Sequence, residues 1–200
     1  MANFKTAITL FFLYTNSEAA QNLNFQYAVN LQNGGLLIKE KEFLKTGNSS
    51  RFELERWYRS RSLFLGVFGQ GWCSSFDEKL VKKNKGQIEL ITCDSPRPIL
   101  FEIQPQADHY LSKERPDEKI RSSFGSYTRY RKNTLLNQFD FRGELKAFRN
   151  QNQLWKIKRN ERKLIESLAP EKGASLTVEW HPLLSTVEGL SSAKDSISFR

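Results

Sequence analysis

The sequence predicts an all-β fold of antiparallel hairpins and meanders, and three observations support this class. Aromatic residues make up 12% of the chain, with fifteen Phe against one Met, and flat rings pack well on pleated sheets. Glycine-containing turns at 33–35 and 83–86 separate short extended segments. Only the stretch 161–168 has helical spacing, and it is too short to form a stable helix by itself.

The first half of the chain contains strands, turns and one glycine corner. Residues 21–46 form a hairpin, and the strand that begins near Phe52 leads to the corner, where Gly69 and Gly71 lie between Phe68 and Trp72. Two such glycines allow backbone conformations that a Cβ forbids. After the corner we expect one strand over 72–81, a turn at 83–86, strands over 87–93 and 99–103, and a polar surface loop over 104–118.

The two cysteines, Cys73 and Cys93, lie on opposite arms of the hairpin expected after the corner. If Lys82 pairs with Gln87, Cys73 lies opposite position 96, three residues away from Cys93. A disulfide therefore requires a bulge or a different register. Two buried free thiols are the alternative.

The N-terminus has the pattern of a secretory signal peptide over residues 1–19. Lys5 precedes an apolar run at 7–14, and Ser17-Glu18-Ala19 fits a cleavage site. A buried first strand is the alternative. Export would place the protein in the periplasm, on the cell surface or outside the cell, where a disulfide can form. The apolar run is too short to span a bilayer, so no transmembrane segment is expected.

The sequence suggests no enzyme, cofactor or metal site. A catalytic base needs a positioned partner, and neither His109 nor His181 has one in the sequence pattern. Ser74-Ser75 matches no nucleophile elbow. The spacing of the two cysteines and two histidines fits no standard zinc site.

All the excess positive charge lies between Lys113 and Lys163, where Lys and Arg outnumber Asp and Glu by nine. Aromatic residues are interleaved with these cations, a mixture that can bind polyanions such as polysaccharide, anionic lipid or nucleic acid. A solvated face that keeps the protein soluble is the alternative. The candidate contacts are Arg129, Arg131, Lys132, Lys156, Lys158, Arg159, Arg162 and Lys163.

The corner also carries a family resemblance. The order R-x-Y-x-S, then F-G-x-G-W, then D-x-x-L resembles the N-terminal domain of the Rhs and YD-repeat proteins, which are large bacterial surface and polymorphic-toxin proteins. The residues in these positions are Arg56, Tyr58, Ser60, Phe68, Gly69, Gly71, Trp72, Asp77 and Leu80. Further on, 139–145 is similar to a YD repeat, and Trp180 begins a degenerate copy 41 residues later. A middle copy near 159–164 lacks both the aromatic residue and the glycine.

This resemblance implies a domain organisation and a non-catalytic role. We expect a signal peptide at 1–19, an Rhs-like β domain at 20–126 and degenerate YD-type repeats at 127–200. The protein would be an exported structural or interaction module that resembles the start of a β-shell, as a truncated or stand-alone relative. A basic module that binds polyanions is the alternative function. The apolar, alternating segment at 196–200 should be an open edge strand that pairs with another Rhs-type chain or a second copy.

Overall fold

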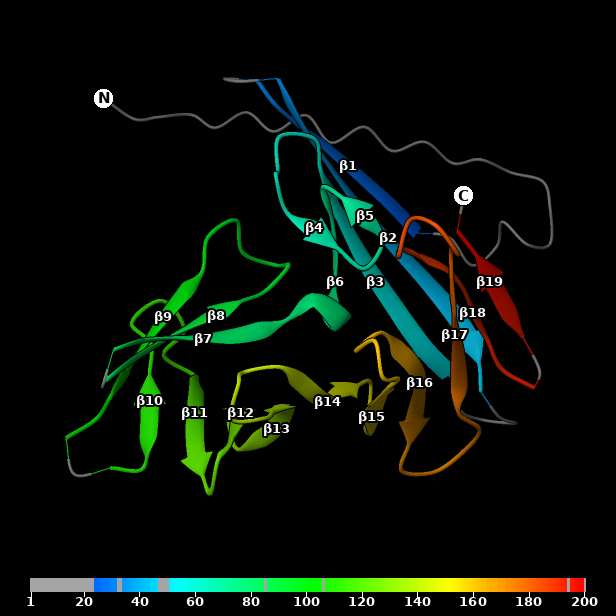
Figure 1. Ribbon diagram of the computed structural model, residues 1–200. Helices are drawn as coiled ribbons and strands as arrows, with labels where there is room; N and C mark the ends of the chain where they lie inside the picture. Colours follow the sequence, from blue (N-terminus) through cyan, green and yellow to red (C-terminus); the bar gives the residue numbers. More distant parts are fainter. Residues whose placement is uncertain are drawn as a thin grey trace.

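The computed structural model describes residues 24–31, 34–46, 51–84, 86–105, 107–193 and 195–199, and these residues form an all-β structure of antiparallel strands (Figure 1). The expected signal peptide lies outside the described residues. Within them the one helical element is a 3-10 turn, η2 (Ser75–Asp77). No helix in this described part of the chain has the length and apolar content needed to cross a membrane.

A four-stranded sheet opens the structure. Its strand order is β1-β2-β3-β6, and a small hairpin of β4 and β5 precedes β6. Phe52 and Leu54 alternate with half-buried residues along β3 and point into the core, as the period of a strand requires. The bounds are β1 (Asn24–Asn30), β2 (Gly35–Lys45), β3 (Arg51–Arg59), β4 (Leu65–Gly66), β5 (Gly69–Gln70) and β6 (Trp72–Ser74).

The remaining strands form one 13-stranded sheet, in which each strand lies beside its neighbour in sequence. Polar turns separate strands whose apolar residues face the core, as in β8, where Ile88 and Leu90 are buried. The bounds are β7 (Lys79–Asn84), β8 (Gln87–Ile91), β9 (Ile99–Ile103), β10 (His109–Leu111), β11 (Glu118–Ser123), β12 (Ser126–Arg131), β13 (Thr134–Phe139), β14 (Leu145–Asn150), β15 (Gln153–Arg159), β16 (Ile165–Pro170), β17 (Leu176–Trp180), β18 (Val187–Ser191) and β19 (Ser196–Ser198).

One expectation about these strands needs correction: the stretch 104–118 contains β10 and is not a continuous loop. The end of the stretch 161–168, which has helical spacing, belongs to β16. The position of the expected domain boundary, between 126 and 127, lies in β12.

The first half of the long sheet closes on itself. The amide of Leu80 in β7 donates to the carbonyl of Gly143 at 2.9 Å, and Lys79 bridges Glu144. Because Gly143 and Glu144 lie between β13 and β14, this contact joins the first strand of the sheet to its middle. Strands β7 to β13 therefore curve into a small barrel that this one bridge closes, and they lie at the left of Figure 1.

The four-stranded sheet packs against the second half of the long sheet. Asn150 accepts from the amide of Glu53 and donates to its carbonyl. The core between the sheets is aromatic: the ring centroid of Phe52 lies 4.8 Å from that of Trp155 and 6.2 Å from that of Phe148. Since both sheets supply its residues, neither could bury its apolar face alone.

β19 ends the long sheet, and its apolar side is covered from within the chain. Ile197 and Phe199 pack against the core, and the Phe199 ring lies 5.0 Å from that of Phe68. The outer hydrogen-bonding edge of β19 has no neighbouring strand among the described residues.

Candidate functional site

The glycine corner has the backbone geometry that its sequence predicts. Gly69 and Gly71 have φ of +102° and +78°, conformations that residues with a Cβ rarely adopt. A Cβ on Gly71 would also lie 2.8 Å from the ring of Tyr58. The corner brings Trp72 beside Tyr58, with ring centroids 5.3 Å apart. Ser60 follows β3, and its hydroxyl accepts from the amide of Leu36 in β2.

Arg56 fills the space that the corner creates. Its guanidinium pairs with Glu40 and Glu42, each at 2.7 Å. The rings of Phe68, Trp72 and Phe199 surround the same group at 5.0, 4.9 and 4.2 Å. Burial raises the pKa of Glu40 and of Glu42, and Arg56 opposes this rise. The chain's own arginine therefore occupies this aromatic cage and holds the end of β19 in place.

Asp77 fixes the geometry of the chain after the corner. One oxygen accepts from the amide of Val67 at 2.8 Å, and the other accepts from the amide and hydroxyl of Ser74. Burial raises the pKa of Asp77 by more than these hydrogen bonds lower it, so the net pKa is raised. Ser74 and Asp77 form a capping box at η2, so the chain turns where one strand over 72–81 was expected. The expectation of one continuous strand is wrong. The S-x-x-D spacing of Ser74 and Asp77 indicates the capping box and therefore the turn. Leu80 is the second residue of β7, beyond the turn, and is buried.

The same turn brings Cys73 and Cys93 together in a disulfide with a Cα–Cα distance of 5.5 Å. Because η2 separates β6 from β7, the hairpin register does not constrain Cys73. The bond joins the four-stranded sheet to the segment after β8 in the long sheet. Arg59 reinforces the junction by donating to the carbonyl of Cys93 at 2.8 Å. The carboxylate of Asp77 lies within 4.8 Å of both sulfurs, but bonded sulfurs are not thiolate ligands for a metal.

Replacing both cysteines with serine should lower the free energy of unfolding by about 3 kcal/mol. The bond closes a loop of 20 residues in sequence separation, and the loss of loop entropy in the unfolded chain sets this magnitude. Urea unfolding of the wild type with and without a thiol reductant measures the effect. The C73S/C93S variant serves as the control, since reductant should not change its stability. Equal midpoints for oxidised and reduced wild type would contradict the prediction.

A cluster of buried charges lies at the end of the closed barrel. Arg129 is 3% exposed, and its guanidinium contacts Glu118 at 2.8 Å, Glu78 at 3.1 Å and the Asn137 side chain at 3.2 Å. Burial raises the pKa of Glu118, but the hydrogen bonds and charges of Arg129 and Arg131 outweigh this, so the net pKa is lowered. Burial raises the pKa of Glu78. Sequence patterns miss this cluster because its partners are far apart in the chain.

The cluster changes the interpretation of the basic segment. Arg129 is not available to a polyanion, because it neutralises buried carboxylates. Arg131 also pairs with Glu118, Lys158 pairs with Glu166, and Arg159 is partly buried. The exposed members Lys132, Lys156, Arg162 and Lys163 form no ion pair with another described residue. Lys132 lies in a turn at the opposite end of the strands from Arg162 and Lys163, so the candidates do not form one patch.

A turn of the same form recurs along the second half of the chain. In the turn 140–144 the amide of Asp140 donates to the carbonyl of Glu144 at 2.9 Å, and the Asp140 side chain accepts from the Glu144 amide. In the turn 160–164 Asn160 and Leu164 make the same two contacts. A shift in strand register precedes each turn, at Gln138/Phe139 and at Lys158/Arg159. The middle copy, which appeared weak in sequence, has the same structure.

His181 provides the third copy, in a turn that is one residue longer. Its amide donates to the carbonyl of Thr186, and its Nδ1 accepts from the amides of Leu183 and Leu184. A register shift at Glu179/Trp180 precedes it. A side-chain acceptor at the first position is therefore common to the three turns, whereas the glycine is not: Gly143 and Lys163 occupy equivalent places with φ of +84° and +64°.

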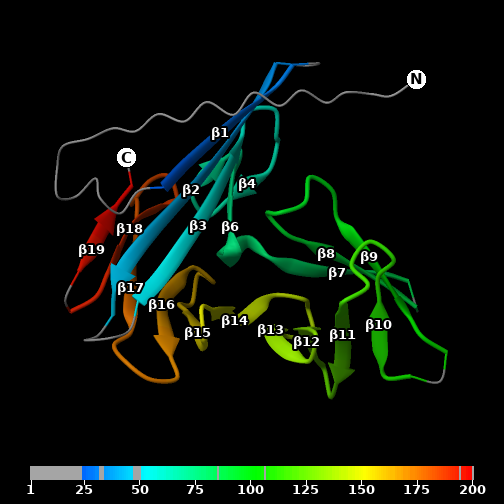
Figure 2. The same ribbon diagram turned by 180° about the vertical axis from the view of Figure 1, so that it is seen from behind.

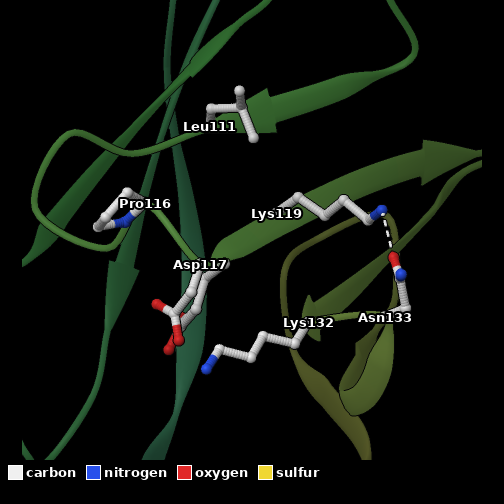
Figure 3. A pocket seen from close by; sticks show the side chains of 7 residues that line it. Leu111, Pro116, Asp117, Lys119, Lys132 and Asn133 are labelled. Carbon is white, nitrogen blue, oxygen red and sulfur yellow. Dashed lines mark hydrogen bonds between the residues drawn. The ribbon is translucent and has the colours of Figure 1, made fainter.

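One pocket of about 200 Å³ lies beside the charged cluster (Figure 3). Asp117 and Lys132 point to one side of it, and Lys119 donates to Asn133 on the other at 2.9 Å. Its walls contain acidic and basic groups but no histidine, cysteine or serine. The mixed charges of the pocket favour no ligand of one sign.

No curated protein matches the chain. A family model described as "Domain of unknown function (DUF6531)" matches residues 26–99. This region runs from β1 through the glycine corner and the disulfide to the first residue of β9. The similarity therefore covers the part of the molecule in which the corner, the Arg56 cage and the disulfide join the two sheets.

Proposed function

We propose that this protein is an exported, non-catalytic structural module that begins a β-shell of YD-type repeats. The observation that carries the proposal is the turn shared by 140–144, 160–164 and 181–186. Repeats of this kind bury their apolar faces only against stacked neighbours. The residues that resemble the Rhs N-terminal domain lie within the matched region at 26–99. This region supplies the sheet on which the repeats pack.

The outer edge of β19 is the place where such a shell would continue. An edge strand presents N–H and C=O groups that can pair with another strand. In our proposal the strand that pairs with β19 belongs to the next repeat. That repeat comes from a longer relative, another Rhs-type chain or a second copy. The covered apolar side of β19 supports addition at the edge, because Phe199 already holds the strand against Arg56.

A variant that carries a second copy of residues 160–199 after residue 199 tests this proposal. We expect the added copy to extend the sheet and to slow hydrogen exchange at the amides of β19. The matched control carries the same added residues in scrambled order and should leave that exchange unchanged. If the ordered copy stays unfolded and β19 exchanges as in the parent chain, the protein does not begin a shell.

Binding of polyanions through charge is a second candidate function, favoured by the exposed Lys156, Arg162 and Lys163. Retention on a heparin column at low salt should fall steeply as salt rises, because bound cations release counterions. The K156E/R162E/K163E variant should lose most of this retention, whereas R129Q should not, since Arg129 is buried. Absence of retention at low salt would leave these cations as a solvated surface.

A further inference from the structure

The free end of the β1–β2 hairpin and the loop before β4 project together from the molecule (Figures 1 and 2). Two hydrogen bonds between Leu36 and Ser60 join the hairpin to the loop. Leu63 is 91% exposed, Leu65 75% and Leu31 67%. Soluble surfaces seldom gather large aliphatic residues in this way without a binding role. The aliphatic tip, as we call it, consists of Val29, Leu31, Leu37, Leu63 and Leu65.

The charge near the aliphatic tip has one sign. No charged residue occurs from Asn24 to Ile38, and between Trp57 and Phe76 the only charged residues are Arg59 and Arg61. Arg59 donates to the Cys93 carbonyl, whereas Arg61 is exposed. A surface with arginine and without carboxylates in its own segments complements an anionic partner.

A belt of aromatic residues lies directly below the tip. Tyr27, Ile38, Tyr58 and Trp72 are paired in one row across the four strands. In the next row Lys39 pairs with Trp57 and places its ammonium 4.7 Å from that ring. Further down, Lys41 forms ion pairs with Glu53 and Glu55. Neighbouring rows point to opposite faces of the sheet. Along the strands, the two faces taken together thus change from aliphatic to aromatic to ionic residues.

This order matches the depth profile of a membrane interface, where aliphatic groups lie deepest, Tyr and Trp lie at headgroup level and ion pairs remain in water. The three residue steps from Ala28 to Leu31 span about 10 Å, which is the depth that interfacial apolar groups reach. Protein-binding hot spots instead favour Trp, Tyr and Arg over Leu and Val. We propose that the aliphatic tip inserts into the headgroup region of an anionic lipid surface, with Arg61 facing the phosphates.

Vesicle sedimentation tests this inference on the full chain. The wild type should bind vesicles that contain phosphatidylglycerol, and it should bind pure phosphatidylcholine vesicles more weakly. The L63S/L65S variant should bind anionic vesicles at least tenfold more weakly, because two exposed leucines no longer leave water. The emission of Trp57 and Trp72 should shift to the blue on binding, since both lie at the belt. The R61Q variant should bind the two kinds of vesicle with a smaller difference in affinity than the wild type does.

The matched control is F124S/F141S, which removes two exposed aromatic residues from turns far from the tip. It should bind vesicles as the wild type does, and circular dichroism should show that each variant is folded. Equal binding by L63S/L65S and the wild type would overturn the proposal. The proposal would also fail if the wild type does not bind anionic vesicles and instead sediments as a dimer, and L63S/L65S sediments as a monomer. In that case the tip contacts a second copy.

Discussion

Replacing Arg129 with alanine is expected to lower the free energy of unfolding by about 3–5 kcal/mol. The change leaves Glu78 without a cationic partner, and it leaves Glu118, whose side chain is 0% exposed, with only Arg115 and Arg131. A buried carboxylate without a partner is among the costliest defects that one substitution can create. Urea unfolding of the R129A variant at neutral pH measures the loss.

Two further variants separate the effect of the buried ion pairs on stability from the effect of losing a positive charge. Arg131 pairs with the same Glu118, but its side chain is 46% exposed, so R131A should cost no more than about 1 kcal/mol. The R129L/E118L/E78L variant removes all three charges together and should recover much of the stability lost in R129A. If R129A and R131A have the same small effect, water already solvates the cluster.

Replacing Gly143 with alanine should cost about 3–5 kcal/mol and open the barrel. A Cβ at this position would lie 2.0 Å from the carbonyl oxygen of Leu80, and φ is +84°. The residue therefore faces backbone strain and also a collision with the strand that closes the ring. Rapid hydrogen exchange at the amide of Leu80 would report the opening, since this amide donates to Gly143.

Gly125 offers a matched control because its φ is similar, at +80°, while its Cβ would meet only the Phe141 side chain at 3.7 Å. G125A should thus cost about 1–2 kcal/mol through strain alone. The difference between G143A and G125A isolates the contact with β7. Equal losses in the two variants would show that closure of the barrel contributes little to stability.

Local features of the structure could be predicted from the sequence. The spacing of Gly69 and Gly71 indicates the corner, and the sequence also indicates the strand that begins near Phe52. The S-x-x-D spacing of Ser74 and Asp77 indicates a capping box, but the expected strand over 72–81 runs through it. Extending the hairpin register through this turn places Cys73 away from Cys93.

Long-range features could not be predicted in the same way. The burial of Arg129 depends on Glu78, which reaches it only because β7 closes the barrel at Gly143. No spacing rule relates these positions. The turn at Asn160 has neither the aromatic residue nor the glycine of a YD repeat, so its sequence indicates the repeat only weakly. Its structure depends instead on an oxygen or nitrogen acceptor at the first position.

The sequential order of the 13-stranded sheet has a consequence for how the protein folds. Each strand finds its partner in the next strand along the chain, so most pairing closes short loops and has a low entropic cost. The sheet can therefore grow hairpin by hairpin from either half. The contacts Glu53–Asn150 and Val67–Val187 join residues far apart in sequence. These two contacts can form only after the strands between them are paired. The two sheets are therefore expected to join late, after the meander has formed.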